Sequence, residues 1–219
     1  MINEIRSMCV ISDGYPSRGN SEYSFVQELV EQFAKNGIDC CVVVPQSISH
    51  ALVHRGRVKE RTTVNRHHGG CIRVLRPPYL SLSGKMLYAL TRTFFWHACR
   101  RAVKDRKFDV YYGHFLHNGV IAAALAERNG GRACAAAGES KFKAGFLQAN
   151  MEKLKKLHKV IAVSSEMKKR CVEMKFCSPE DILVCPNAIN PGTFHRMDRA
   201  EARKQLHWGD ELFVAAYVG

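Results

Sequence analysis

The sequence predicts an α/β protein built on a doubly wound, mostly parallel sheet. Short apolar runs recur along the chain, most of them apolar throughout and bounded by polar, glycine or proline residues, as in strands covered on both faces. Segments with apolar residues at helical spacing lie between these runs. This alternation is typical of βαβ units, and 46% of hydrophobic residues in a chain of 219 is enough to build a core.

The expected strands follow the apolar runs in chain order. They cover residues 7–12 (SMCVIS), 40–45 (CCVVVP), 71–76 (CIRVLR), 110–114 (VYYGH), 133–137 (ACAAA), 160–164 (VIAVS) and 182–185 (ILVC). Ligands of such sheets bind beyond the carboxyl ends of the strands, so the loops that follow them are the candidate sites. Between Pro45 and Cys71 the chain is polar and rich in Arg and His, which predicts a mobile loop.

The expected helices lie between the strands. The first covers residues 20–35, where four apolar residues recur at helical spacing and Asn36-Gly37 forms a favourable C-cap. Further helices are expected over residues 84–105, 118–129, 145–158 and 165–175.

The C-terminal segment departs from this pattern. Residues 197–208 predict a short helix, and residues 211–219 (ELFVAAYVG) predict a strand that stops at a glycine. We therefore predict a first domain over residues 1–195. Residues 196–219 would form a linker helix and the first strand of a truncated second domain.

The charge of the chain is strongly positive. Thirty-three Lys and Arg against twenty Asp and Glu give a net charge of +13, which attracts phosphates, nucleic acid or an anionic membrane surface without choosing among them. The first residues lack the pattern of a secretory signal, and no apolar run approaches the roughly twenty residues of a membrane-spanning helix. These features predict a cytoplasmic location, with any membrane contact made at the surface.

The nine cysteines are odd in number, lie mostly in apolar runs and include no CxxC pair. They are therefore expected to be reduced and mostly buried. The His67-His68 pair and Cys71 have no recognised ligand spacing, so no metal is assigned.

The segment from Val160 to Asn190 carries the most specific motif. Its order of strand, Ser-Ser, helix, strand and PNAIN resembles the N-terminal, acceptor-side domain of family 4 glycosyltransferases, whose GT-B fold sets two Rossmann-like domains across a cleft. In that family a V-x-PNG-hydrophobic-D segment leads into the donor domain, whereas this chain has Ala188 and Asn190 in place of the Gly and the Asp. The loop SDGYPSRGN and the segment DVYYGH extend the resemblance over nearly the whole chain.

The resemblance implies the N-terminal domain of a retaining enzyme. Such an enzyme moves a sugar from a nucleotide-sugar to a polysaccharide or lipid-linked acceptor, without an obligatory metal or other cofactor. In that family the groups that bind the donor and stabilise the departing diphosphate belong mostly to the second domain. We therefore expect the chain alone to be inactive.

The loop after the first expected strand is a candidate phosphate or acceptor site. Gly14 and Gly19 allow a positive φ and close backbone approach, and the following helix presents free N–H groups. The resemblance implies that Gly19, Asn20 and Ser21 contact the donor diphosphate or the acceptor. The alternative is an ordinary βα turn with Asn20 or Ser21 as the N-cap. No GxGxxG dinucleotide fingerprint is present.

Two histidines stand where the central expected strand ends. His114, at its carboxyl end, is a candidate catalytic residue that would line the cleft and titrate near neutrality. The alternative is a histidine that only hydrogen-bonds a neighbouring carbonyl group. His117 is the weaker candidate, and no Asp or Glu lies close to either of them in the sequence.

The segment AAAGES at 135–140 departs from the family. Many family members have a histidine just before its glycine, credited with a catalytic or sugar-binding role, and here Ala137 stands there. Glu139 is the nearest carboxylate that could replace it, which makes it a candidate catalytic residue. The alternative is that Glu139 and Ser140 cap a helix. The expected donor or acceptor contacts also include Gly138, Ser140, Ser164 and Asn187.

Residues 85–107 combine cations with bulky apolar side chains. This composition predicts an interfacial helix with Arg92, Arg100, Arg101 and Lys104 facing lipid headgroups. The alternative is a helix packed on the sheet. Both hold if one face of the helix packs on the sheet and the other carries the cations.

Two rival functions remain open. A basic module that binds nucleic acid or an anionic surface would suit the charge, but aromatic residues are not interleaved with the basic ones and no nucleic-acid-binding signature is present. A nucleotide-dependent oxidoreductase would need the glycine fingerprint that is missing. The expected partners are therefore a nucleotide-sugar donor, a glycan or lipid-linked acceptor and an anionic membrane surface, but no nucleic acid.

Overall fold

The computed structural model describes residues 5–18, 21–49, 61–66, 69–82, 87–104, 106–140, 142–187, 191–192 and 195–217. The chain divides into two compact units, Met1–Pro186 and Asn187–Gly219. The domain boundary expected between residues 195 and 196 stays a prediction.

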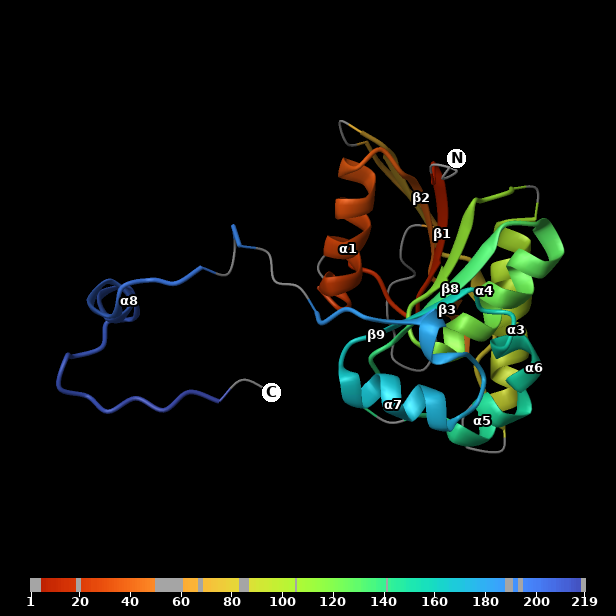
Figure 1. Ribbon diagram of the computed structural model, residues 1–219. Coiled ribbons are helices and arrows are strands. Elements are labelled where there is room, and N and C mark those ends of the chain that lie inside the picture. The colour runs from red at the N-terminus through yellow and green to blue at the C-terminus, as the bar shows by residue number, and fades with distance from the viewer. Residues whose placement is uncertain are drawn as a thin grey trace. The chain divides into compact units, whose positions relative to one another are not determined.

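The first unit is built on a doubly wound sheet, which confirms the predicted fold class (Figure 1). In the described residues the sheet has eight strands in the order β10-β9-β8-β7-β1-β2-β5-β4. All neighbouring strands are parallel except β4, which runs antiparallel to β5. The strands are β1 (Ser7–Ile11), β2 (Asp39–Val43), β4 (Thr62–Arg66), β5 (Cys71–Leu75), β7 (Val110–Gly113), β8 (Arg132–Ala137), β9 (Lys159–Ala162) and β10 (Ile182–Val184). A second pair joins β3 (Gln46–Ser47) to β6 (Pro78–Tyr79).

The apolar runs became strands because both faces of the sheet are covered. Alternate residues of β1 enter two separate cores: Cys9 and Ile11 pack with one, Met8 and Val10 with the other. Helix α1 (Ser24–Lys35) covers the second core, and Figure 1 shows it on the opposite side of the strands from α3 and α4. The first core is covered by α3 (Tyr88–Ala102), α4 (Leu116–Asn129), α5 (Ala144–Ala149), α6 (Met151–Leu154) and α7 (Ser165–Glu173).

Two predictions for the first unit need correction. The helix expected over 145–158 is two short helices, α5 and α6, because the Asn150 side chain donates to the Phe146 carbonyl at 2.9 Å and ends α5. The loop expected between Pro45 and Cys71 contains β3 and β4, while residues 50–60 and 67–68 of it lie outside the described residues. β4 escapes prediction because it is a polar, largely exposed edge strand without an apolar run.

The second unit contains one of the two expected elements. The helix expected over 197–208 is α8 (Arg199–Leu206), whose N-terminus is capped by Asp198. The expected strand 211–219 is wrong for residues 211–217, and residues 218–219 lie outside the described part. A strand needs hydrogen bonds from a neighbouring strand. The described part of this unit offers none, and Phe213 is 96% exposed.

The sheet reverses its winding between β1 and β7. From β1 the chain continues outward through β2 and β5, and from β7 it continues in the other direction through β8, β9 and β10. In an open α/β sheet the crevice at this switch point, beyond the carboxyl ends of the strands, is where ligands bind. No helix in the described residues is long and apolar enough to cross a membrane.

Candidate functional site

A buried arginine and a histidine converge on Asp13, the second residue after β1. Arg92, on α3, donates from Nη1 to Asp13 Oδ1 at 3.1 Å and from Nη2 to Asn118 Oδ1 at 2.7 Å. His117, in the first turn of α4, lies with Nε2 at 2.5 Å from Asp13 Oδ2. Three segments far apart in the sequence therefore meet at the carboxyl edge of β1 and β7.

The Asp13 carboxylate is held in its charged form. Burial by itself would raise the pKa of Asp13, but the hydrogen bond from His117 and the Arg92 charge outweigh it and hold the pKa below its ordinary value. The carboxylate thus stays negative at neutral pH at the sheet's switch point. No local sequence pattern indicates this pairing, because Asp13 is typical of a turn and Arg92 lies 79 positions away.

His114 is buried beside this cluster. Its Nδ1 lies 3.3 Å from the Tyr112 hydroxyl, and its ring is 5.3 Å from the Phe25 ring and 4.5 Å from the Phe115 ring, centroid to centroid. Its Nε2 is buried and has no hydrogen-bond partner in the part of the chain that the structure describes. Burial lowers the pKa of His114 to about 4, although the Asp13 charge partly opposes the shift. The imidazole is therefore neutral at pH 7, not titrating near neutrality as its sequence position suggested.

Glu139 is tied to the start of α4. Its Oε1 accepts from the Leu116 N–H at 2.9 Å and its Oε2 accepts from the Gly138 N–H at 3.0 Å. A carboxylate at a helix N-terminus satisfies a free N–H group and complements the helix dipole. The capping alternative therefore applies, but to α4, which precedes Glu139 in the chain, rather than to the helix that follows. This contact leaves the predicted catalytic role of Glu139 untested.

The turn from β7 into α4 is strained. Phe115 has φ 74° and ψ 152°, a region that residues with a side chain rarely adopt. Such strain persists only where surrounding contacts hold it. Here the Glu139 bond to Leu116 and the Asn118 side chain, which donates to the His114 carbonyl at 2.8 Å, fix both sides of the turn.

Small residues let α4 lie close to the sheet. A Cβ added to Gly113 would meet the backbone of Asn118 and Gly119 within 2.4 Å, and one added to Gly119 would meet the Ala135 Cβ at 2.6 Å. Ala137 is fully buried in the same core. The position where many family members have a histidine is therefore packed against helices in this chain.

The first loop is described only in part. Gly19 and Asn20 lie outside the described residues. Gly14 does not have the positive φ that was expected; it is needed because a Cβ there would meet the Tyr23 ring at 2.2 Å. Ser21 is exposed and does not cap α1, which begins at Ser24 without a side-chain cap bond.

The remaining expected contacts are spread out. Gly138 follows β8, next to Glu139, and Ser140 is exposed at the mouth of a groove beside α5. Ser164 is the N-cap of α7, where its hydroxyl accepts from the Met167 N–H at 3.1 Å. Asn187 begins the second unit. None of these four residues is found in contact with Asp13 in the described part of the chain, and their binding roles stay predictions.

The structure also bears on the predictions for the cations of residues 85–107, the cysteines and metal ligands. Arg92 does not face lipid as expected, because its guanidinium is buried against Asp13, whereas Arg100, Arg101 and Lys104 are exposed. All nine cysteines are free, and most are buried, although Cys185 is exposed. No group of metal-ligating side chains that could hold an ion occurs within the described residues.

The arrangement can bind and orient a polar ligand. The site holds a charged carboxylate, a second carboxylate at the start of α4 and a neutral imidazole whose unpartnered nitrogen is buried. An unpartnered buried nitrogen is costly unless a ligand or water satisfies it. Hydroxyl groups, which donate and accept, match this set.

Comparison with known proteins places these features in context. The family model described as Glycosyltransferase Family 4 matches residues 24–193. A search of curated protein sequences finds no match.

Solved structures match nearly the whole chain. Two sucrose-phosphate synthase chains from Thermosynechococcus elongatus are 13% and 14% identical, with TM-scores of 0.61 and 0.68; the matches cover 92% and 94% of this chain and 97% and 53% of theirs. HepE from Anabaena, solved with UDP and glucose, is 11% identical with a TM-score of 0.55 over 93% of this chain and 50% of its own. The lipopolysaccharide outer core galactosyltransferase WaaB is 14% identical with a TM-score of 0.53 over 84% and 46%.

At these identities the likeness shows the fold alone. Except for one of the two sucrose-phosphate synthase chains, this chain spans about half the length of the structures that it matches.

Proposed function

The chain belongs to glycosyltransferase family 4, and we propose that it is the N-terminal, acceptor-side domain of a retaining hexosyltransferase. The enzyme would transfer a sugar from a nucleotide-sugar to a polysaccharide or lipid-linked glycan, for polysaccharide biosynthesis in the cytoplasm. No metal or other cofactor is assigned to the reaction.

Family membership, together with the polar edge at the switch point, carries this proposal. HepE, which has the same fold, was solved with UDP-glucose, which favours a nucleotide-sugar as the donor here. This chain spans about half of HepE, and we assign donor binding in the proposed enzyme to a second domain.

The proposed roles follow from the geometry of the edge. Neutral His114 would bind a hydroxyl of the acceptor or of the transferred sugar through Nε2, which is buried and unpartnered in this structure and must become exposed to do so. Asp13 fixes His117 and Arg92, and so holds the loop after β1 against the start of α4. Glu139 positions the first turn of α4 through Leu116. The departing diphosphate is an anion, so its stabilisation needs cations or helix N-termini, which the donor domain would supply.

The test uses an enzyme that carries this chain together with a donor-binding domain. It is incubated with UDP-, GDP- and ADP-sugars and a lipid-linked glycan extract, and nucleotide release and product are measured. Transfer with at least one donor, and NMR of the product showing the donor's anomeric configuration, supports the proposal. Inversion would refute retention, and absence of transfer with every donor would refute the function.

Two variants test the site in that enzyme. Glu139→Ala should lower turnover at least about tenfold, because α4 loses the carboxylate that fixes its first turn. Glu180→Ala, at an exposed glutamate just before β10, is the matched control and should retain activity. An active enzyme indifferent to Glu139→Ala would remove Glu139 from the site without touching the family assignment. The 219-residue chain by itself should transfer no sugar.

Peripheral membrane contact is a further part of the proposal. The exposed cations at the end of α3 and just beyond it, Arg100, Arg101 and Lys104, would meet anionic headgroups. Replacing all three by Glu should abolish co-sedimentation with vesicles of phosphatidylserine and phosphatidylcholine at low salt. Unchanged co-sedimentation would refute this contact. A steep salt-dependent retention of DNA or RNA on a filter would instead favour the alternative of a basic binding module.

A further inference from the structure

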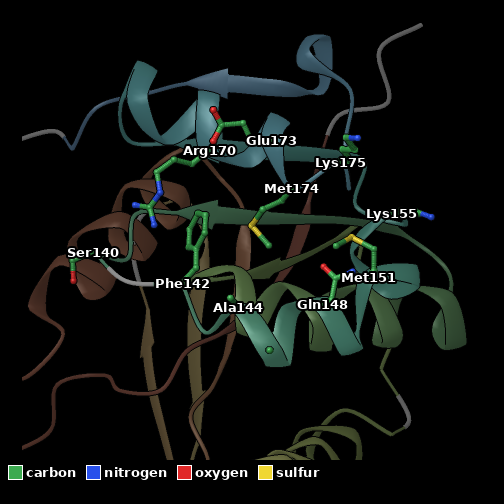
Figure 2. Close-up of a pocket in the computed structure, with 11 residues that line it drawn as sticks. Ser140, Phe142, Ala144, Gln148, Met151, Lys155, Arg170, Glu173, Met174 and Lys175 are labelled. Carbon is green, nitrogen blue, oxygen red and sulfur yellow. The ribbon is translucent and has the colours of Figure 1, made fainter.

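An open groove lies between α7 on one side and α5 and α6 on the other. It is within the first unit, and its volume is about 1150 Å³. Figure 2 shows Ser140 and Phe142 at one end, Lys155 and Lys175 at the other, and two methionines between them. Because Ser140 follows β8 and adjoins Glu139, the groove starts near the carboxyl edge of the sheet.

The floor of the groove is apolar and deformable. Phe142, Met151 and Met174 line it and are only partly buried, although each packs against the core. Methionine side chains are flexible and polarizable, so they adapt to ligands of irregular shape. Exposed apolar side chains that line a concave surface mark a binding site more often than scattered ones do.

The rim of the groove is cationic. Lys155, Arg170 and Lys175 line it, against Glu173 as the one acidic residue among the lining side chains that the structure describes. The Arg170 guanidinium lies 4.3 Å from the centre of the Phe142 ring. In the described part of the chain no hydrogen bond from the Arg170 guanidinium is found, so its planar fork of donors remains available to a phosphate.

We propose that this groove binds a single-chain alkyl or isoprenoid phosphate, with the chain along Met151 and Met174 and the phosphate on Arg170. Apolar floor and cationic rim match the two parts of such an amphiphile. The inference rests on the proposed function in one respect, since it identifies this amphiphile with the lipid end of the acceptor. The phosphate end would then lie at the mouth of the groove, nearest the sheet edge.

A bare glycan fits the groove less well. Sugar rings bind to the open faces of aromatic side chains, and the aromatic ring in this groove, Phe142, has one face covered by Arg170. The two methionines offer no hydrogen-bond donors to sugar hydroxyls. The lining therefore favours a hydrocarbon chain over a polysaccharide.

The test measures binding of dodecyl phosphate to the 219-residue chain by isothermal titration calorimetry, below the concentration at which it forms micelles. Arg170→Gln should weaken binding about tenfold, because it removes a charge-assisted hydrogen bond. Lys169→Gln is the matched control: it removes an exposed cation from the neighbouring position of α7 that does not line the groove, and should leave affinity within about twofold.

Further binding measurements test the alkyl chain and the phosphate of the ligand separately. Inorganic phosphate and dodecyl maltoside should each bind at least about tenfold more weakly than dodecyl phosphate, since each lacks one part. Met174→Gln should weaken dodecyl phosphate binding while leaving the circular dichroism spectrum unchanged. Equal binding by wild type, Arg170→Gln and Met174→Gln would overturn the proposal, as would inorganic phosphate binding as tightly as dodecyl phosphate.

These outcomes are independent of sugar transfer. If dodecyl phosphate binds as expected and the two-domain enzyme transfers no sugar, the groove stands and the proposed function fails. If sugar transfer is found but Arg170→Gln does not weaken dodecyl phosphate binding, the proposed function stands and the groove proposal fails.

Discussion

Acidification should destabilise the protein through His114. Its pKa is lowered from 6.5 to about 4 by burial, so between these values the unfolded chain binds a proton that the folded chain does not. Stability is therefore fully present above pH 6.5, falls as the pH drops towards 4, and changes little more below that. From pH 7 to pH 5 the unfolded imidazole becomes almost fully protonated, which costs about 2 kcal/mol of unfolding free energy.

Urea unfolding followed by circular dichroism at pH 7 and pH 5 measures this loss. His114→Phe removes the titration and keeps an aromatic ring among Phe25, Phe115 and Tyr112, so its loss over this range should be about 2 kcal/mol smaller than that of wild type. His97→Gln, which removes an exposed imidazole on α3, should follow wild type. If His114→Phe and wild type lose the same free energy, the imidazole is protonated in the folded state and the reasoning fails.

Three further substitutions and one control test the packing of the first unit by urea unfolding. Asp13→Asn should cost about 2 kcal/mol at pH 7, because it uncharges a partner of a buried arginine, and the difference from wild type should shrink as the pH falls below about 4. Gly113→Ala should cost about 3 kcal/mol or more, since its Cβ meets backbone, whereas Gly145→Ala, which meets nothing within 4 Å, should not destabilise. Ser164→Ala should cost about 1 kcal/mol through the lost cap of α7. Unchanged urea midpoints in Asp13→Asn, Gly113→Ala and Ser164→Ala would contradict the packing described.

Apolar runs predict most of this sheet because strands buried on both faces need them. Residues 7–12 and 110–114 locate β1 and β7 well, since their side chains enter cores on both sides. β4 and the break at Asn150 depend instead on edge pairing and on one side-chain hydrogen bond, which periodicity does not register.

At the candidate site, too, sequence patterns do not reveal contacts between distant segments. His114 and Glu139 were accessible to prediction because each follows an apolar run, where the carboxyl edge of a sheet must lie. Asp13 was not, because its importance comes from Arg92, and nothing local in either segment signals the pairing. Nor does sequence position reveal that burial keeps His114 neutral.

The small side chains of β8 make substitutions at this edge interdependent. Ala137 is enclosed by the core that also contains Leu116 and Leu147, so an imidazole introduced there would displace helices rather than reach a substrate. Ala137→His should thus destabilise the domain by about 1–3 kcal/mol or more. A larger side chain at position 137 therefore requires smaller residues on the facing helices at the same time.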